Sequence, residues 1–320
     1  MNPIPSPFQT FQTGDQPRRE RADKWLSARF PDFSRSQVQT WFREGRVTHE
    51  DATPLKPGEI LPPNCTVRVQ APEPETRSLP TASPMDLEIL HEDESLIVVN
   101  KPHDLVVHPA PGHLDGTLTN ALLHRYPDLA GVGDPMRPGL VHRLDADTSG
   151  VIVFARTAEA LADLQRQFHD RETHKTYQCL VRGIPSKAEG EIDLPLGRHP
   201  VDRKRRAVNG VGARPALTRY RMLEGLAAGT AALFEVEIHT GRTHQIRVHL
   251  AHIRHPVLGD AVYGGRRPQL PGGWPQASRQ MLHAFRLRFS HPKDKVPLEI
   301  TAPLPEDMQN YLDALRNRTP

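Results

Sequence analysis

The sequence predicts a chain of two domains, of which the larger has an α+β fold built on a mixed, largely antiparallel sheet. With 320 residues, the chain is long enough for one large domain and one small one. A proline-rich stretch with acidic and hydroxyl side chains, 72–84, predicts a linker between them. Beyond it, short apolar runs alternate irregularly with amphipathic helical patterns, which is typical of α+β proteins. The predicted organisation is a disordered tail (1–17), a small domain (18–71), the linker (72–84) and a large domain (85–320).

The small domain begins with two helical patterns. The tail before it, 1–17, is rich in Pro, Gln and Thr and shows no hydrophobic period, so we expect it to be disordered. Residues 22–30 and 35–44 carry apolar side chains at helical spacing, and Val38 and Trp41 belong to the buried stripe of the second helix. Short strands are predicted after these helices, at 46–47, 60–61 and 67–69.

In the large domain, changes of hydrophobic period mark the elements. Apolar runs at 87–90 and 96–100, separated by a polar turn, predict a β-hairpin. Two helices are predicted over 118–126 and 158–168, and each follows a threonine that can cap it. The GxGxxG motif of a doubly wound dinucleotide-binding fold is absent after the first strand. Further strands are predicted at 151–155, 176–181, 216–222 and 232–239.

Composition and charge exclude several classes of protein. The formal net charge is +3, which permits an anionic partner without requiring one. No apolar stretch approaches the roughly 20 residues of a membrane span, and the first residues lack a signal-peptide pattern, so we expect a cytoplasmic protein without membrane contact. Cys65 and Cys179 lie in no CxxC motif and no histidines form HExxH, so we expect reduced thiols and no metal site.

A candidate catalytic carboxylate lies in residues 142–150, HRLDADTSG, directly before the apolar run 151–155. Asp145 stands beside an arginine on a turn that leads into a buried strand, where a charge must be functional or carefully paired. Asp147, two residues on, is interpreted as a turn or cap residue. The spacing alone also permits a purely structural role for Asp145, as a turn cap or in an ion pair.

Two further motifs follow later in the chain. Lys175-Thr176-Tyr177 opens a predicted strand, and residues 240–250, TGRTHQIRVHL, lie between the end of a strand and the start of a helix. Together with 142–150, in this order and at this spacing, they closely resemble the RluA/RluD family of RNA pseudouridine synthases, and within it the RluD type. The resemblance covers nearly all of 18–315 and is supported by further motifs at 100–102, 107–109, 116–123 and 255–260.

The resemblance implies an isomerase that breaks the N1–C1′ bond of a uridine, rotates the freed uracil and rejoins it through C5, with no cofactor. Asp145 matches the catalytic aspartate of the family, which acts as a nucleophile or as a base at the ribose 2′ carbon. Arg247 matches the arginine paired with it, since a guanidinium at bonding distance keeps a carboxylate ionised in a dry pocket. Tyr177 matches a tyrosine that stacks on the uracil, although strand tyrosines also serve as core packing.

The resemblance also implies how the pocket is lined and where RNA makes contact. Ile246 and Leu258 are expected to line the pocket, and Arg143 matches a position near the space left by the flipped nucleotide. Arg242 is a candidate RNA contact. A basic segment predicts a hairpin arm against the RNA backbone, with a solvated loop as the alternative; its cations are Arg203, Lys204, Arg205 and Arg206.

The small domain resembles the S4-like RNA-binding domain. The resemblance rests on residues 21–26, 34–39 and 45–47. It implies two helices with an exposed basic surface that follows a phosphate backbone, and the matching cations are Arg21, Lys24, Arg35 and Arg43. The chain departs from the family at 49–52, His-Glu-Asp-Ala, where an Asn-Gly hairpin turn is common.

The partner expected from these motifs is structured RNA, with large-subunit ribosomal RNA as the substrate of a monomeric enzyme. One alternative is the same chemistry on transfer RNA. Another is a non-catalytic RNA-binding or ribosome-assembly factor with this fold, which the presence of Asp145, Tyr177 and Arg247 disfavours. A glycosidase would need a second positioned carboxylic acid, and none stands out near Asp145.

Overall fold

The computed structural model describes residues 8–15, 20–31, 33, 35–72, 79–110, 113–202, 204–265, 270 and 273–317. The chain divides into two compact units, Met1–Ser78 and Leu79–Pro320. The boundary between them falls inside the stretch 72–84 that composition predicts to be a linker. No helix among the described residues is long and apolar enough to cross a membrane.

The small unit packs two helices against a three-stranded antiparallel sheet with the strand order β1-β3-β2. Leu26, Val38 and Trp41 are central to its core. Where the sequence predicts a strand at 60–61, Ile60 forms only an isolated bridge with Arg21. The elements are β1 (Gln9–Gln12), α1 (Ala22–Ser27), α2 (Arg35–Arg43), β2 (Val47–His49) and β3 (Thr66–Val69).

The expectation of disorder throughout the N-terminal tail is wrong for β1. Residues 9–12 pair antiparallel with β3, from Gln9 opposite Val69 to Gln12 opposite Thr66. The ring of Phe11 contacts that of Phe30 edge to face, with centroids 5.5 Å apart. A polar segment can add to a sheet edge because the pairing uses backbone hydrogen bonds, which composition does not reveal.

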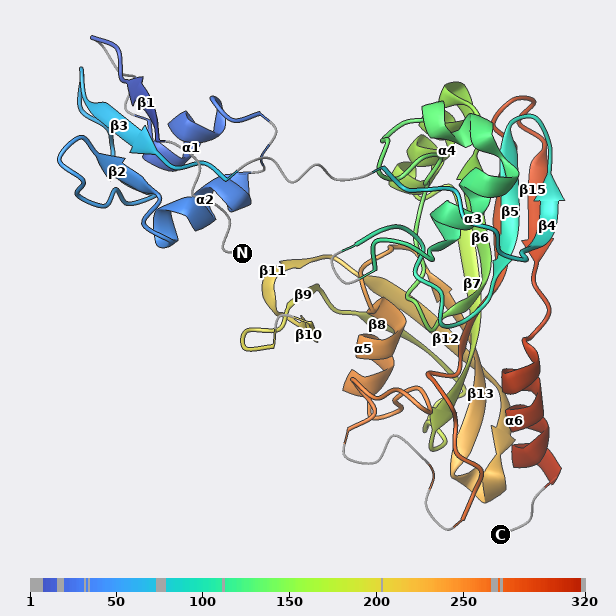
Figure 1. Cartoon of the computed structure of the whole chain (residues 1–320). Coiled ribbons are helices and arrows are strands. Elements are labelled where there is room, and N and C mark those ends of the chain that lie inside the picture. Colours follow the sequence, from blue (N-terminus) through green and yellow to red (C-terminus); the bar gives the residue numbers. More distant parts are fainter. Residues whose placement is uncertain are drawn as a thin grey trace. The chain divides into compact units, whose positions relative to one another are not determined.

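The large unit is built on a mixed and largely antiparallel sheet, as the sequence predicts. The described residues form nine strands in the order β4-β5-β6-β14-β7-β13-β12-β8, with β15 paired to β14 (Figure 1). All of these pairings are antiparallel except that of β6 with β14. The strands are β4 (Glu88–Glu92), β5 (Leu96–Lys101), β6 (Ser149–Ala155), β7 (His174–Arg182), β8 (Glu189–Asp193), β12 (Leu217–Leu226), β13 (Ala231–Ile238), β14 (Leu282–Ser290) and β15 (Pro297–Thr301).

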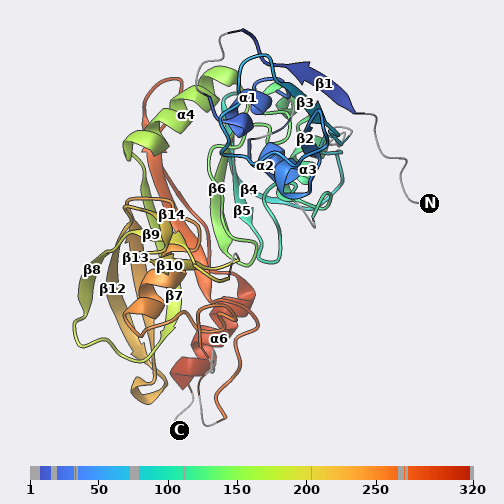
Figure 2. The same cartoon turned by 90° about the vertical axis from the view of Figure 1, so that its left-hand side faces the viewer.

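Helices cover separate parts of this sheet. Apolar side chains of α4, Ala160 and Leu164, pack against β6, while Met308 and Leu312 of α6 pack with Leu180 of β7. Figures 1 and 2 place α4 and α6 at opposite ends of the sheet. The helices are α3 (Leu118–Arg125), α4 (Ala158–Asp170), α5 (Gln245–His252) and α6 (Glu306–Asn317), with short 3-10 turns η1 (Pro127–Gly131) and η2 (Ala227–Gly229).

The structure adds elements that local sequence patterns did not predict. The segment after residue 260 contributes β14 in the middle of the sheet, as well as β15 and α6. Another small antiparallel sheet, in the order β10-β9-β11, follows β8 and lies where the sequence predicts a hairpin arm in the basic segment. Its strands are β9 (Leu196–Arg198), β10 (Arg206–Val208) and β11 (Val211–Arg214).

The crossing of β6 and β14 requires a glycine. Gly150 pairs with Ala284 in the parallel ladder and has a φ of 110°. A Cβ atom at this position would overlap the carbonyl oxygen of Ala284. The close approach brings the turn that carries Asp145 directly against the central strands of the sheet.

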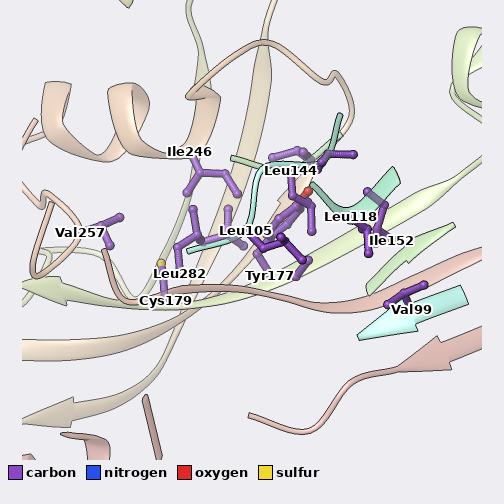
Figure 3. Packing of buried hydrophobic residues seen from close by; sticks show 14 of the residues in the cluster. Val99, Leu105, Leu118, Leu144, Ile152, Tyr177, Cys179, Ile246, Val257 and Leu282 are labelled. Atoms are coloured by element: carbon purple, nitrogen blue, oxygen red, sulfur yellow. The ribbon is translucent and has the colours of Figure 1, made fainter. Parts of the chain in front are cut away.

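The main hydrophobic core lies beside the candidate motifs. Leu105, Leu144 and Tyr177 pack together, and Ile246 of α5 belongs to the same cluster (Figure 3). The residues of β6 are all buried, so the turn before this strand leads directly into the core. The candidate carboxylate at Asp145 is therefore anchored on one side by Leu144 and on the other by β6.

Candidate active site

Asp145 and Arg247, which are 102 positions apart, meet in a charge-assisted hydrogen bond. Arg247 Nη1 donates to Asp145 Oδ2 over 2.9 Å. Asp145 lies in the turn before β6 and Arg247 in the first turn of α5, which begins after His244 in the left-handed conformation (φ 58°). The side chains are 19% and 7% exposed, so the pair is shielded while the carboxylate still reaches a cavity. The predicted partners are thus in contact.

Asp260 is a second carboxylate on the same guanidinium, and the sequence interpretation missed its role. Arg247 Nε donates to Asp260 Oδ2 over 2.7 Å, and Nη2 donates to Oδ1 over 3.0 Å. The same Oδ1 accepts the backbone N–H groups of Val262 and Tyr263, both over 2.9 Å. A buried arginine that offers one edge to a first carboxylate needs a partner for the other edge, which is the signal that could have indicated Asp260.

Electrostatics favour the charged forms of Arg247 and Asp260. Burial alone would lower the pKa of Arg247, but the hydrogen bonds and charges of Asp260 and Asp145 raise it above its ordinary value. Burial alone would raise the pKa of Asp260, but the bonds from Arg247 and the two backbone N–H groups lower it. Arg247 is therefore shared between two carboxylates, so Asp145 is not its only partner.

Tyr177, on β7, lies near Asp145 at the wall of the same cavity. Its side chain belongs to the main core cluster and also lines the cavity, so Tyr177 packs in the core and remains accessible from the cavity. Burial, and to a lesser degree the negative charge of Asp145, raises the pKa of Tyr177. The hydroxyl therefore stays protonated and can donate a hydrogen bond.

The residues around Asp145 enclose a cavity of about 650 Å³. This volume is in the range of small-molecule and nucleotide sites. Ile246 lines it, as the resemblance implies, and so do Arg143, Arg242, Asp145, Tyr177 and Arg247. Among the lining residues Asp145 is the only carboxylate, while Arg143, Arg171, Lys175, Arg214, Arg242 and Arg247 are cations.

Leu258 does not line the cavity, contrary to expectation. Its N–H donates to the carbonyl of Leu180, and its own carbonyl accepts from Met281. Successive side chains of a strand point to opposite faces, so Leu180 faces away from its neighbours Cys179 and Val181. Leu258 packs with Leu180 in the core beneath α6, whereas Tyr177 and Cys179 belong to the core on the cavity side.

His142, which also lines the cavity, and Asp147, which does not, both help to hold the turn. His142 Nε2 accepts the N–H of Val153 over 3.2 Å, and its ring stacks on Phe168 with centroids 4.6 Å apart. Burial and the charge of Lys175 lower the pKa of His142 to about 3, so the ring is neutral. The side chain of Asp147 is exposed, and its backbone carbonyl accepts a bond from Arg279.

Lys101 holds the turn that carries Asp145, a role that the sequence did not indicate. Its fully buried Nζ donates to the carbonyls of Pro102, Leu105 and Ala146, each over 2.7 Å. Ala146 is the neighbour of Asp145, so this lysine fixes the backbone beside the carboxylate. Burial lowers the pKa of Lys101 to about 7.

The basic arm reaches the site through Tyr263. The backbone N–H of Arg206, in β10, donates to the Tyr263 hydroxyl over 2.8 Å, and the Arg205 guanidinium lies 5.5 Å from the Tyr263 ring. The same hydroxyl is 2.8 Å from Nδ1 of His244, whose Nε2 lies 3.9 Å from Asp145. Lys204 is exposed, and Arg203 lies outside the described residues.

In the small unit, several predicted RNA-contacting cations have internal partners. Arg21 and Arg35 both donate to the buried carboxylate of Asp23. Lys24 pairs with Glu20 over 2.9 Å, and Arg43 bonds to the Thr40 hydroxyl and the Gln39 carbonyl of its own helix. About half of the Arg21 and Arg35 side chains remains exposed, so their outer edges stay accessible.

The described residues contain no group of three or more His, Cys, Asp or Glu that could hold a metal ion. Both cysteines are free thiols. The chemistry that the arrangement can perform is that of a carboxylate held by a guanidinium, next to a protonated tyrosine, in a cavity whose wall carries several cations.

Comparisons with known proteins agree with this geometry. A profile of the RNA pseudouridylate synthase family matches residues 95–252. An uncharacterized RNA pseudouridine synthase of Chloroflexus aurantiacus is 47% identical over 299 residues, which cover 93% of this chain and 91% of the relative. The ribosomal large subunit pseudouridine synthase D of Escherichia coli K12 is 42% identical over 306 residues, with the same coverage. The solved human RNA pseudouridylate synthase domain containing 1 has 32% identity and a TM-score of 0.55, over 68% of this chain and 83% of that one. The chain therefore belongs to the RNA pseudouridine synthase family.

Proposed function

We propose that this enzyme isomerises specific uridines to pseudouridine in large-subunit ribosomal RNA, with Asp145 as the catalytic carboxylate. The observation that carries the proposal is the hydrogen bond between Asp145 and Arg247 at the wall of a nucleotide-sized cavity. The choice of RNA rests on the relative named ribosomal large subunit pseudouridine synthase D, which matches over 93% of this chain.

The reaction needs a carboxylate that is ionised but not fully neutralised. Asp145 either attacks C1′ of the ribose or takes a proton from C2′, and the N1–C1′ bond breaks in both cases. The free uracil then rotates, C5 bonds to C1′, and the C5 proton is lost while N1 gains one, so the product is an isomer. Arg247 donates hydrogen bonds to both Asp260 and Asp145. The arginine therefore orients the Asp145 carboxylate without fully neutralising its negative charge.

Tyr177 is proposed to hold the uracil during rotation. Its ring can stack on the base while its hydroxyl donates to an edge of the ring. The raised pKa favours this role over one as a free phenolate base. Ile246 would contribute an apolar wall, and Arg143, exposed at the rim, is free to occupy the space left by a flipped nucleotide.

The small unit is proposed to be an S4-like RNA-binding domain. The exposed edges of Arg21, Lys24, Arg35 and Arg43 would follow the phosphate backbone, and the segment with Lys204, Arg205 and Arg206 would contact RNA near the cavity. We further propose that the protein works as a monomer in the cytoplasm; its free thiols and ribosomal substrate support this localisation.

The proposal is tested by mapping pseudouridines in ribosomal and transfer RNA from cells with and without the protein. Loss of specific sites from large-subunit RNA is expected, and loss from transfer RNA alone would identify the other substrate class. Cells that carry Asp145→Asn should match the deletion, and cells that carry Asp147→Asn should match wild type. If Asp145→Asn cells keep every pseudouridine, the chain is a non-catalytic factor.

A further inference from the structure

Lys175 is a buried cation that lacks a partner within the described part of the chain. The residue is 8% exposed and lines the active-site cavity. Among the described residues, none places a carboxylate within ion-pair distance of its Nζ or accepts a hydrogen bond from it. Nζ lies 5.4 Å from the centroid of the Phe168 ring. A charge buried in this way costs folding free energy unless something outside the chain completes the site.

Three other buried cations of the large unit, Lys101, Arg247 and Arg279, have hydrogen-bond acceptors within the protein. Lys101 donates to three carbonyl oxygens. Arg247 is shared by two carboxylates, and Arg279 donates to Asp307 and to several carbonyls. Lys175 differs from all three, because it lines the cavity and its Nζ has no acceptor among the described residues.

The charged groups around Lys175 are also positive or neutral. Lys175 pairs through its backbone with Ile238 of β13 and Leu287 of β14, and α4 presents Phe168 and Arg171 to it. The ionisable neighbours within electrostatic reach are Arg171, His142 and His239. Burial, aided by Arg171, lowers the pKa of Lys175 to about 8, so most of the side chain is protonated at pH 7.

Arg171 extends this positive region along the cavity wall. It ends α4 in the left-handed conformation (φ 63°), and no ion pair to its guanidinium is formed by the residues that the structure describes. Arg242 and Arg214 also line the cavity. Burial and the nearby charges of Arg214 and Arg171 lower the pKa of Arg242, so these guanidinium groups lie close enough to interact. Among the described residues that line the cavity, the one carboxylate is that of Asp145, and it already bonds to Arg247.

We propose that Lys175 and Arg171 form a subsite for one backbone phosphate of the RNA, next to the uridine that Asp145 attacks. A phosphodiester offers a negative charge and several acceptor oxygens, which suit an ammonium and a guanidinium together. Lys175 and Tyr177 are two positions apart on β7 and point to the same face, roughly 7 Å apart along the strand. The phosphate would thus be held beside the base that stacks on Tyr177. The inference rests on the proposed action on RNA and specifies where the backbone enters.

The test uses the full chain and a short single-stranded RNA with one central uridine among adenosines. Lys175→Met keeps the length of the side chain and removes its charge; Lys293→Met, an exposed lysine outside the cavity, is the matched control. Lys175→Met is expected to weaken binding about tenfold, as for the loss of one charge-assisted contact. The slope of log affinity against log salt should fall by about 0.7, as for one phosphate of a single strand. Lys293→Met should change neither quantity.

Replacing one phosphate that flanks the uridine with a neutral methylphosphonate identifies the partner. The wild type should lose about tenfold in affinity for one of the two flanking positions, and Lys175→Met should lose nothing further at that position. Thermal unfolding without RNA supplies a second readout: Lys175→Met should be at least as stable as wild type, because an unpaired buried charge is removed.

Two results would overturn the phosphate subsite. One is a Lys175→Met protein that keeps the wild-type sensitivity to methylphosphonate, which would place phosphate recognition elsewhere. The other is a marked loss of thermal stability with unchanged binding, which would make Lys175 a structural residue. Both readouts are independent of turnover, so an enzyme without activity on ribosomal RNA would count against the proposed substrate and leave this test intact.

Discussion

Asp260→Asn would test how far the Asp260 carboxylate holds the Arg247 side chain in place beside Asp145. The amide would keep one acceptor oxygen for the guanidinium and for the N–H groups of Val262 and Tyr263, but the carboxylate that makes the two-bond contact would be lost. The cluster of Asp145, Arg247 and Asp260 would change from one net negative charge to neutral. Arg247 would then be drawn toward Asp145 alone.

The size of the effect follows from burial. Arg247 and Asp260 are, as whole residues, 5% and 1% exposed, and breaking a buried ion pair by removing one partner costs about 3–5 kcal/mol. The retained amide oxygen places the expected loss near the lower end, about 3 kcal/mol. Because Asp260 does not line the cavity, KM should change little. The turnover number should fall about 100-fold, which is the scale for a misplaced catalytic group.

The assay combines urea unfolding of the full chain with pseudouridine formation on an unmodified large-subunit RNA transcript. Asp147→Asn is the matched control, because it removes an exposed carboxylate from the turn that carries Asp145. Asp260→Asn should unfold at lower urea than the control and turn over more slowly at temperatures where it is still folded. If its unfolding midpoint and turnover number both equal those of Asp147→Asn, the role assigned to the Arg247–Asp260 contact is wrong.

Three further predictions address the fold, the small unit and pH. Gly150→Ala should lose about 3 kcal/mol in urea unfolding, because the new Cβ would overlap the Ala284 carbonyl in a left-handed backbone; an unchanged midpoint would contradict the close approach of β6 and β14. Deleting 1–78 should leave the large unit folded but weaken transcript binding and flatten its salt dependence, and an unchanged salt slope would remove the small unit from RNA binding. The pKa of Lys175, about 8 in the folded protein and ordinarily 10.5, implies that the charged lysine costs roughly 3 kcal/mol. The stability gain from Lys175→Met should therefore be full below pH 8 and shrink as pH rises toward 10.5; a gain that does not vary with pH would refute the linkage.

Local patterns predicted much of the large unit. The apolar runs before 156 and the capped helix after Thr157 correspond to β5, β6 and α4, because hydrophobic period and caps act over a few residues. Elements after 260 went unpredicted although β14 lies in the middle of the sheet. Its position comes from pairing with β6 and β7, which are more than 100 positions earlier in the chain.

The candidate site was likewise predicted only in part. The resemblance to a known family indicated Asp145, Tyr177 and Arg247, and in the structure all three line one cavity. Leu258 was misplaced because only the register of its backbone bond to Leu180 decides which face of β7 it covers.

The family and most helices and strands could be predicted from the sequence, because each depends on residue types at short or fixed spacing. How the charges of the candidate site are shared depends on the folded chain. Asp260 completes the partners of Arg247, and Lys175 is left with none among the described residues. Whether a buried charge is paired depends on which distant segments fold against it, and that information is absent from the local sequence around any one of these residues.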